Sequence, residues 1–218
     1  MDSRSGARVA VGRRSAQVAR PRVLVACEFS GRVRDAFSRR GLDAYSCDLL
    51  PSETPGQHYT GDVRDVLGLL PWDLVLAFPP CTYLCSSGLH WNKRRPERAA
   101  LTEDALEFVR LFLDAPVPRV ALENPIGCIS SRIRKPDQII HPWQFGHDAS
   151  KATCLWLKGL PLLRPTVVLP GGRKARRANQ TASGQNKLPP SPDRWKLRSE
   201  TYQGIADAMA DQWAPLLR

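Results

Sequence analysis

The chain has 218 residues, of which 42% are hydrophobic and 24% charged, a balance typical of a globular protein with one compact domain and appendages. No stretch approaches the ~18 consecutive apolar residues of a membrane-spanning helix, and the basic N-terminus lacks the apolar segment of a secretory signal. Six cysteines without paired short spacings predict neither disulfides nor a metal site. These patterns exclude an integral membrane protein and a disulfide-rich secreted one, so we expect a cytoplasmic protein.

The net charge of +11 is concentrated in two appendages. Residues 1–20 carry a net +4 and residues 173–198 a net +7, so the rest of the chain is neutral overall. A neutral body with two basic appendages predicts a polyanionic partner, most often a nucleic acid. The alternative is that both appendages only keep the protein in solution.

Hydrophobic periodicity predicts the elements in chain order. Residues 1–20 lack a helical stripe and predict a mobile basic arm. Short apolar runs predict strands at 22–27, 42–48, 58–62, 72–78, 118–124, 141–146 and 152–160. Helical spacing predicts helices at 32–41, 63–70, 97–115 and 199–217.

Two of these helices have well-defined apolar faces. The expected buried face of the helix at 97–115 consists of Leu101, Ala105, Phe108, Val109 and Phe112. In the last helix, Ile205, Met209 and Trp213 share a face, and Ser199 is suited to begin the helix. Between these helices, residues 165–198 are basic and rich in proline and glycine, which predicts a long loop with little core of its own.

Alternating strands and helices predict an α/β fold with a mostly parallel sheet and helices on both faces. Right-handed crossovers bring the carboxyl ends of such strands to one edge, where these sheets bind ligands. The polar residues that end the strands are Glu28, Asp48, Asp62, Cys81 and Glu123. We expect all of them to line that edge, although Asp62 is equally suited to cap the helix that follows it.

The sequence LVLAFPPCTYLCSSG ends a buried strand in two prolines and a cysteine. A cysteine at a strand end is most often inert packing. Here Pro79 and Pro80 restrain the backbone just before Cys81, and a later strand ends in Glu-Asn-Pro at Glu123. We therefore interpret Cys81 as a nucleophile, and Cys85 as a packing residue.

The order of the motifs ACEFSG, CD, GD, DLVLAFPPC and ALENP resembles the DNA cytosine-5 methyltransferases, especially the small forms carried by phages. The resemblance covers residues 22–163 and the last helix. It implies a Rossmann-like methyltransferase fold with a catalytic core at 21–164, a minimal target-recognition segment at 165–198, and a C-terminal helix at 199–218 that packs back on the core. It also implies S-adenosylmethionine as cofactor, DNA with a flipped-out cytosine as substrate and, for a phage protein, the host cytoplasm as location.

The same resemblance implies roles for individual residues. Cofactor binding falls to Glu28, Phe29, Ser30, Gly31, Asp48, Asp62 and Pro80. Of these, Asp48 would accept the ribose hydroxyls and Asp62 would meet the adenine amino group. Cys81 would be the nucleophile, and Glu123 would hold the cytosine edge. Substrate contacts would come from Asn124, Pro125, Lys151, Arg173, Lys174, Arg176 and Arg177.

The chemistry explains why these residue types are needed. Carbon 5 of cytosine is too electron-poor to attack a methyl sulfonium, and a thiolate that adds at carbon 6 makes it nucleophilic. A carboxyl group on the ring nitrogen and exocyclic amine offsets the charge that builds up during addition. We therefore expect Glu123 to have a raised pKa in an apolar pocket. Because a base inside a duplex is out of reach, it would have to be flipped out.

The chain departs from the family at several points. SKATCLWLKG stands where an Arg-rich strand is usual, so Lys151 either takes over part of that role or is a solvated turn residue. TYQGIADAM replaces the usual Gly-Asn motif, which leaves the cofactor contact at Tyr202, Gln203 or Gly204 open. The recognition segment is also much shorter than in larger relatives, which predicts relaxed sequence specificity or a partner that supplies it.

Two other interpretations remain open. One keeps the pocket but changes the substrate to RNA or a free nucleotide, or the donor to a modified cofactor. The other is a degenerate nucleic-acid-binding protein without turnover. The sequence does not indicate an oligomeric state.

Overall fold

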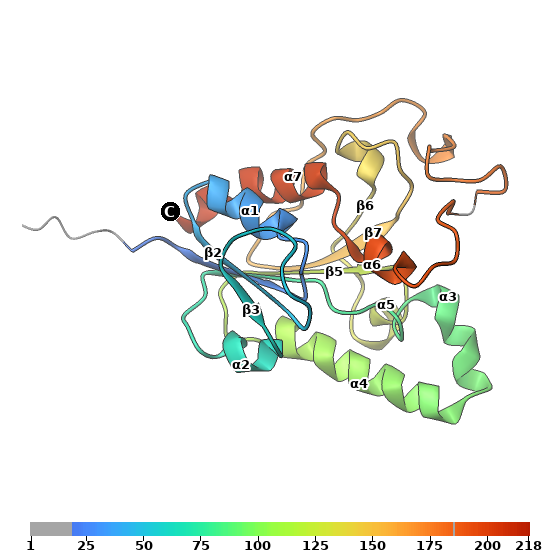
Figure 1. Ribbon diagram of the computed structural model, residues 1–218, viewed down its shortest axis with the longest axis horizontal. Helices are drawn as coiled ribbons and strands as arrows, with labels where there is room; N and C mark the ends of the chain where they lie inside the picture. The colour runs from blue at the N-terminus through green and yellow to red at the C-terminus, as the bar shows by residue number, and fades with distance from the viewer. Residues whose placement is uncertain (1–18, 185) are drawn as a thin grey trace, which may run out of the picture.

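The computed structural model describes residues 19–184 and 186–218, so the arm predicted at 1–20 lies almost wholly outside the described residues. The strands span Arg22–Ala26 (β1), Asp43–Asp48 (β2), His58–Thr60 (β3), Leu74–Ala77 (β4), Val120–Pro125 (β5), Gln138–Ile140 (β6) and Thr153–Lys158 (β7). They form one seven-stranded sheet in the order β3-β2-β1-β4-β5-β7-β6 (Figure 1). The first five in this order are parallel, and β7 runs antiparallel to both of its neighbours.

The helices span Arg32–Arg39 (α1), Val63–Leu67 (α2), Ser86–Leu89 (α3), Pro96–Leu113 (α4), Ile129–Arg132 (α5), Arg194–Ser199 (α6) and Gln203–Trp213 (α7). Short 3-10 turns occupy His90–Lys93, Pro142–Gln144, Gly172–Lys174 and Ala214–Leu217. Figure 1 shows α1 and α7 on one face of the sheet and α2 and α4 on the other. The predicted α/β fold, with a mostly parallel sheet and helices on both faces, is confirmed.

Alternate residues of the central strands pack against opposite helix layers. In β1, Val23 and Val25 join the core under α1 and α7, whereas Leu24 and Ala26 join the core over α2 and α4. This alternation follows from the two-residue period of a strand. A strand buried on both faces is therefore apolar throughout, which is why the run that begins at Val23 was recognisable as a strand in the sequence.

The order of the strands creates a crevice next to β1. The chain passes from β1 outward to β2 and β3, and then crosses back to place β4 on the other side of β1. Open α/β sheets bind ligands where the strand order reverses in this way, outside the carboxyl ends of the strands. The turn after β1 and the loop after β4 therefore flank the expected ligand site.

The buried face of α4 differs from the prediction. Leu101 is 41% exposed, and the fully buried positions are Thr102, Leu106, Val109 and Phe112. The buried face is thus shifted by one residue at the start of α4. Thr102 can be buried there in place of Leu101 because its hydroxyl forms hydrogen bonds to backbone carbonyls. Val109 and Phe112 were predicted correctly.

Two predicted boundaries were wrong. Residues 141–146 are not a strand, because Pro142 opens a 3-10 turn there and the strand β6 lies just before it. Ser199 does not begin the last helix but ends α6, a separate short helix, and α7 starts four residues later. The predicted face of that last helix is correct, since Ile205, Met209 and Trp213 are all buried.

No helix among residues 19–184 and 186–218 is long and apolar enough to cross a bilayer.

Candidate active site

Two pockets adjoin each other at the carboxyl ends of β1 and β4. The first is lined by the turn after β1, the loop after β4, the end of β5, Lys151 and the segment 198–201. The second is lined by the ends of β2 and β3 and the start of α2. Cys27 and Pro80 line both pockets, so the two share a wall at the point where the strand order reverses.

The pockets bring the predicted strand-end residues together in two groups. Glu28, Cys81 and Glu123 line the first pocket. Asp48 and Asp62 line the second. All five thus lie at the same edge of the sheet, in two adjoining pockets.

The loop that carries Cys81 is fixed on both sides. Before it, the Phe78 amide donates to the Ala26 carbonyl (2.9 Å), which extends the β1–β4 pairing into the loop. After it, the Cys81 carbonyl accepts from the amides of Leu84 (3.1 Å) and Cys85 (2.9 Å), and the Leu84 side chain is fully buried. The residue Cys81 is exposed as a whole and lines the first pocket.

The end of β5 also holds this loop. Asn124 is 1% exposed, and its Nδ2 donates to the Pro79 carbonyl (2.8 Å). Pro125, the next residue, lines the same pocket and ends the strand. The Glu-Asn-Pro motif therefore places Glu123 and Cys81 at one pocket through a direct contact between their two segments.

The environment of the pocket shifts the pKa of both groups upward. Burial raises the pKa of the Cys81 thiol, and the nearby Cys85 and Glu123 add to this, whereas the positive charges of Lys151 and Arg198 lower it. Burial also raises the pKa of the Glu123 carboxyl, with Lys151 opposing the shift. A raised carboxyl pKa was the expectation for Glu123.

Glu28 is a buried carboxyl at the base of the first pocket. It is 5% exposed, and burial raises its pKa. The Ser30 hydroxyl donates to its Oε1, but its Oε2 has no hydrogen-bond partner among the described residues. The chain enters this turn through Cys27, whose φ of 59° is left-handed, and leaves it through Gly31, whose φ is 75°. A non-glycine residue in a left-handed conformation costs about 1–3 kcal/mol and persists only where its surroundings enforce it. Such residues cluster at functional sites.

Phe29 occupies the same turn and is 6% exposed. The ammonium of Lys196, from α6, lies 5.2 Å from its ring centroid and 2.7 Å from a Glu53 carboxylate oxygen. Gly31 fits its position because a Cβ there would lie 2.0 Å from the Thr54 hydroxyl. These contacts hold the turn after β1 against the loop after β2.

Asp48 and Asp62 differ in their surroundings. Burial raises the pKa of Asp48, whose Oδ1 accepts from the Leu50 amide (2.9 Å). Asp62 caps α2, since its carboxylate accepts from the Arg64 amide (2.9 Å), and this hydrogen bond lowers its pKa. The capping role was one of the two open interpretations of Asp62, and its carboxylate also borders the second pocket.

Lys151 connects the first pocket to the segment that covers it. Its ammonium donates to the carbonyls of Arg198 (2.9 Å) and Glu200 (3.5 Å). Arg32, at the start of α1, pairs with the Glu200 carboxylate (2.6 Å) and donates to the Thr201 carbonyl (3.1 Å). Lys151 is thus held by backbone carbonyls and is not a free turn lysine. It forms no hydrogen bond with Glu123, but its positive charge lowers the pKa of that carboxyl.

The basic residues predicted to contact the substrate from the segment 165–198 fall into two groups. Arg173, Lys174 and Arg176 are exposed. Arg177 is only 5% exposed, lies 5.3 Å from the Trp143 ring centroid, and donates to the Gly172 carbonyl (2.8 Å). The predicted substrate contact at Arg177 gains no support, because this side chain is buried and its Nη2 anchors the segment.

Gly204 is required by packing. A Cβ there would lie 2.0 Å from the Phe145 carbonyl oxygen, so α7 packs on this loop only without a side chain at that position. Its amide donates to His147 Nε2 (2.8 Å), and the His147 ring lies against Tyr202 (5.2 Å between centroids). Neither Tyr202 nor Gly204 lines either pocket, so the cofactor contact left open at these positions gains no support.

The sequence interpretation missed a basic and aromatic stretch that directly follows the Cys81 loop. It includes Trp91, Arg94, Arg95 and Arg98, around the short helix α3 and the start of α4. Net charge counted over long segments concealed it, because the acidic residues of α4 cancel these cations in the sum. The run LHWNKRRPER was the available signal.

Among the described residues, no group of three or more His, Cys, Asp or Glu side chains is placed to hold a metal ion. No protein-family model matches the chain, and no curated protein matches it in sequence.

Proposed function

We propose that the protein is an S-adenosylmethionine-dependent DNA cytosine-5 methyltransferase that acts through a covalent adduct of Cys81. The observation that carries this proposal is the shared pocket of Cys81 and Glu123 beside a second pocket bordered by Asp48 and Asp62. A transfer between two substrates needs two adjoining sites, one for the base and one for the donor. The parallel strand order 3-2-1-4-5, typical of Rossmann-like sheets, supports the fold that the sequence resemblance implies.

The residues of the second pocket fit the donor. Asp48 and Asp62 offer carboxylate oxygens to ribose hydroxyls and to an adenine amino group. Glu28 lines the adjoining first pocket, and its unpartnered Oε2 would accept from the donor's ammonium. When bound, S-adenosylmethionine supplies a methyl group on a positively charged sulfur. A buried carboxyl such as Glu28 stabilises a cation more strongly in this setting than in water.

In the first pocket, Cys81 and Glu123 act on the base. The Cys81 thiolate forms a bond to carbon 6, and the electrons of the ring double bond become available at carbon 5 for the new bond to the methyl carbon. The bond between the methyl carbon and the donor sulfur would break, with its electron pair going to that sulfur. The carbon 5 proton would then pass to a base, and the electrons of its bond would restore the ring double bond as the bond from carbon 6 to the Cys81 sulfur breaks and releases the thiolate. Because burial raises the pKa of Glu123, this carboxyl can donate a proton to the ring nitrogen while it accepts from the exocyclic amine.

The test is transfer of tritium from labelled S-adenosylmethionine to cytosine-containing DNA, with bisulfite sequencing of DNA from expressing cells. We expect transfer by the wild-type protein, loss of transfer in Cys81→Ser, and retention in the matched variant Cys85→Ser. DNA containing 5-fluorocytosine should trap a covalent complex, since fluorine at carbon 5 does not leave as a proton does. Undiminished transfer by Cys81→Ser would overturn the assignment of the nucleophile.

Parallel reactions with RNA and with dCMP identify the substrate. Transfer to either of these but not to DNA would replace DNA as the substrate and leave the chemistry of Cys81 intact. Absence of transfer to all three, with nucleic-acid binding retained, would favour the nucleic-acid-binding protein without turnover.

A further inference from the structure

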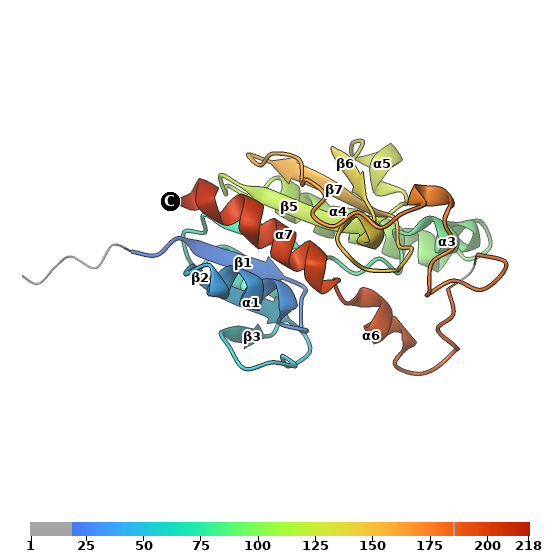
Figure 2. The same cartoon turned by 90° about the horizontal axis from the view of Figure 1, so that it is seen from above.

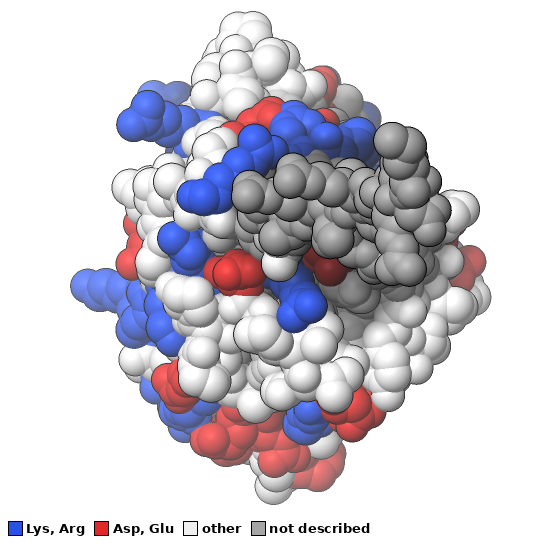
Figure 3. All heavy atoms as spheres, turned by 90° about the vertical axis from the view of Figure 1, so that its left-hand side faces the viewer, with Lys and Arg blue, Asp and Glu red and all other residues white. Residues whose placement is uncertain are grey.

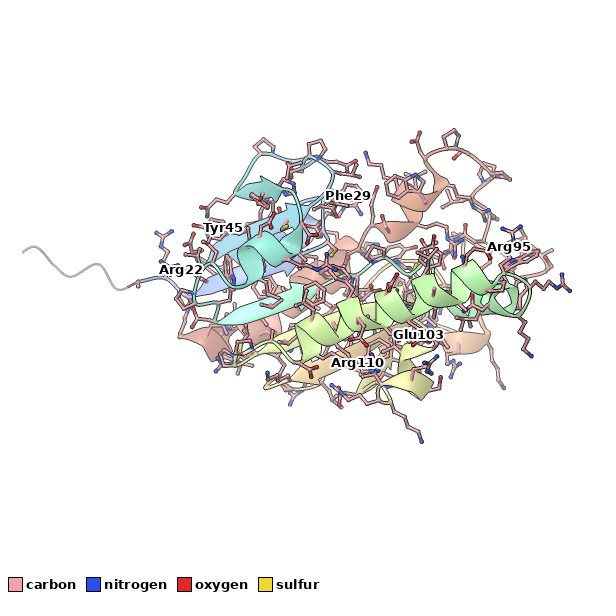
Figure 4. All side chains as sticks on the ribbon, turned by 90° about the horizontal axis from the view of Figure 1, so that it is seen from below. Arg22, Phe29, Tyr45, Arg95, Glu103 and Arg110 are labelled. Atoms are coloured by element: carbon pink, nitrogen blue, oxygen red, sulfur yellow. The ribbon has the colours of Figure 1, made fainter. Side chains whose placement is uncertain are left out.

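A basic and aromatic surface follows directly on the loop that carries Cys81. We define the 83–98 surface by its basic and aromatic side chains, which are the exposed His90, Trp91, Lys93, Arg94 and Arg95 and the half-buried Tyr83 and Arg98. Glu97 is the one carboxylate in this range. Figure 4 shows Arg95 at the start of α4, at the opposite end of this helix from Arg110. The surface therefore lies at the end of the molecule where the parallel strands end.

The cations of this surface have no acidic partners. Lys93, Arg94, Arg95 and Arg98 form no ion pair with any carboxylate of residues 19–184 and 186–218. Further along α4, by contrast, Arg110 pairs with a glutamate on the same helix (2.5 Å). At the other end of the molecule, Figure 3 shows both acidic and basic side chains where grey residues do not cover it. Neighbouring cations without counter-charges repel one another and attract a polyanion.

The aromatic side chains of the surface lie under guanidinium groups. Trp91 is 40% exposed, and the guanidinium carbons of Arg94 and Arg95 lie 5.6 and 5.3 Å from its ring centroid. Arg98 lies 4.8 Å from the Tyr83 ring centroid in the same way. Flat guanidinium and indole groups are the surfaces on which unpaired bases stack, whereas contacts to duplex phosphates need only the charge.

Arg98 connects this surface to the nucleophile loop. Its Nη2 donates to the Thr82 carbonyl (2.7 Å), immediately after Cys81, and its Nε donates to the Gly88 carbonyl (3.3 Å). A nucleic-acid strand bound to Arg98 would therefore contact a side chain that is itself hydrogen-bonded to the residue after Cys81.

A second exposed tryptophan lies on α6, the short helix whose last residues line the first pocket. Trp195, on α6, is 59% exposed and stands between Arg194 and Lys196 in the sequence. Figures 1 and 2 both place α3 and α6 at the same end of the molecule, beyond the carboxyl ends of the strands. Each of the two tryptophans thus lies on a segment that adjoins residues of the first pocket, the 83–98 segment after Cys81 and α6 before Glu200.

We propose that the 83–98 surface binds an unpaired strand of DNA, so that single-stranded or locally unpaired DNA is the preferred substrate. This inference rests on the proposed function for the identity of the reaction. It agrees with the short recognition segment, because an unpaired strand presents its bases without groove reading. The binding itself is carried by unpaired cations and by stacking on Trp91.

The test is binding of fluorescent oligothymidylate, followed by anisotropy, to the full chain without cofactor. We expect tighter binding of this strand than of a duplex of equal length, with Trp91→Ala and Arg94→Glu each weakening it about tenfold and Trp91→Phe close to wild type. Lys135→Glu is the matched control, since it makes the same change in charge at an exposed site near the β6–β7 edge, and it should change the affinity by less than about twofold. Thermal unfolding of each variant checks that the fold is intact.

Three outcomes would overturn the inference: equal affinity for duplex and single strand, no effect of Trp91→Ala, or tighter binding of oligouridylate than of oligothymidylate. The probe contains no cytosine and the assay no donor, so the result does not depend on methyl transfer. Retained binding without any transfer activity would remove the proposed function and leave this surface standing. Methyl transfer to duplex DNA, together with equal binding of duplex and single strand, would leave the proposed function standing and remove the proposed role of the 83–98 surface.

Discussion

Asn124 donates a hydrogen bond of 2.8 Å to the carbonyl of Pro79, and this buried contact joins the end of β5 to the loop that carries Cys81. The two motifs that stood out in the sequence, Pro-Pro-Cys and Glu-Asn-Pro, are thus one structural unit. The amide is the part of the second motif that holds the first, while the preceding glutamate faces the pocket.

Asn124→Ala removes this contact and leaves the Pro79 carbonyl buried without a partner. We expect a loss of about 1–3 kcal/mol in the free energy of unfolding, measured by urea denaturation, because an unsatisfied buried acceptor carries its full desolvation cost. Gln57→Ala is the matched control, since Gln57 donates an exposed side-chain hydrogen bond of 2.7 Å to Asp43. Equal losses in the free energy of unfolding of the two variants would show that the Asn124 hydrogen bond stabilises the fold no more than an exposed one.

The pKa of Cys81 should respond to the charges across the pocket. Burial raises it, the Glu123 carboxylate raises it further, and Lys151 lowers it. Glu123→Gln should therefore shift the midpoint of Cys81 alkylation by iodoacetamide to lower pH and speed the reaction near about pH 8.5, where a normal thiol is half ionised. Lys151→Met should shift the midpoint to higher pH.

Mass spectrometry of the Cys81 peptide separates this reaction from those of the other cysteines. Asp137→Asn serves as the control, because Asp137 pairs with Arg134, accepts from the amide of Leu157 and lines neither pocket. An unchanged midpoint in Glu123→Gln would mean that the carboxylate and the sulfur do not face one pocket.

Arg34 should be among the most costly residues to replace. It is 1% exposed, and its guanidinium donates to Ser46 (3.0 Å), Ser52 (3.0 Å) and the Thr54 hydroxyl (2.7 Å). Arg34→Met removes one hydrogen-bond partner from each of these groups and the ion-pair partner of the Asp35 carboxylate, so we expect a loss of about 3–5 kcal/mol in the free energy of unfolding, measured by chemical denaturation.

The matched control is Arg110→Met, which breaks an exposed ion pair on α4 and should cost less than about 1 kcal/mol. The Arg34 variant should also bind S-adenosylmethionine more weakly where it remains folded, because Ser52 and Thr54 belong to the loop that follows Asp48. A small loss of stability together with normal cofactor binding would contradict this role.

Gly204→Ala should lower stability although alanine favours helices. Helix propensity alone predicts a gain of up to about 1 kcal/mol, but the added Cβ would lie 2.0 Å from the Phe145 carbonyl oxygen. We expect the clash to prevail and to lower the melting temperature, since overpacking against backbone costs about 1–3 kcal/mol.

Gly68→Ala provides the comparison, because no atom lies within 4 Å of a Cβ at that position. It should raise the melting temperature or leave it unchanged. If both variants behave alike, the close approach of α7 to the Phe145 loop is not what selects glycine there.

The elements most reliably predicted from the sequence were those whose burial is complete. β4 and the residues of β1 from Val23 onward are covered on both faces, so all of these residues are apolar and the strands are unambiguous. The segment His141–Gly146 was misassigned, because its alternation of polar and aromatic residues satisfies a strand pattern equally well. Pro142 decides the matter by opening a 3-10 turn.

The segment 165–198 shows that local sequence patterns do not predict the burial of individual side chains either. Arg173 and Arg177 look alike in the sequence, yet one is exposed and the other is buried against Trp143. What distinguishes them is a ring contributed by a loop about thirty residues earlier in the chain, and no local pattern encodes such a neighbour. The 83–98 surface was missed because charge was summed over long segments. Its cations lie together in space, but acidic residues on another part of α4 cancel them in that sum.

The sequence by itself determined the five parallel strands, the helices α1, α2, α4 and α7, the buried residues of the central strands, and the polar residues that end them, because these depend on local periodicity and on turn chemistry. Only the tertiary structure decided how those strand ends divide between two adjoining pockets, that Asn124 holds the Cys81 loop, and that Arg177 is an anchor. These outcomes depend on contacts between residues far apart in the chain, and such contacts become fixed only when the sheet assembles and its core is packed.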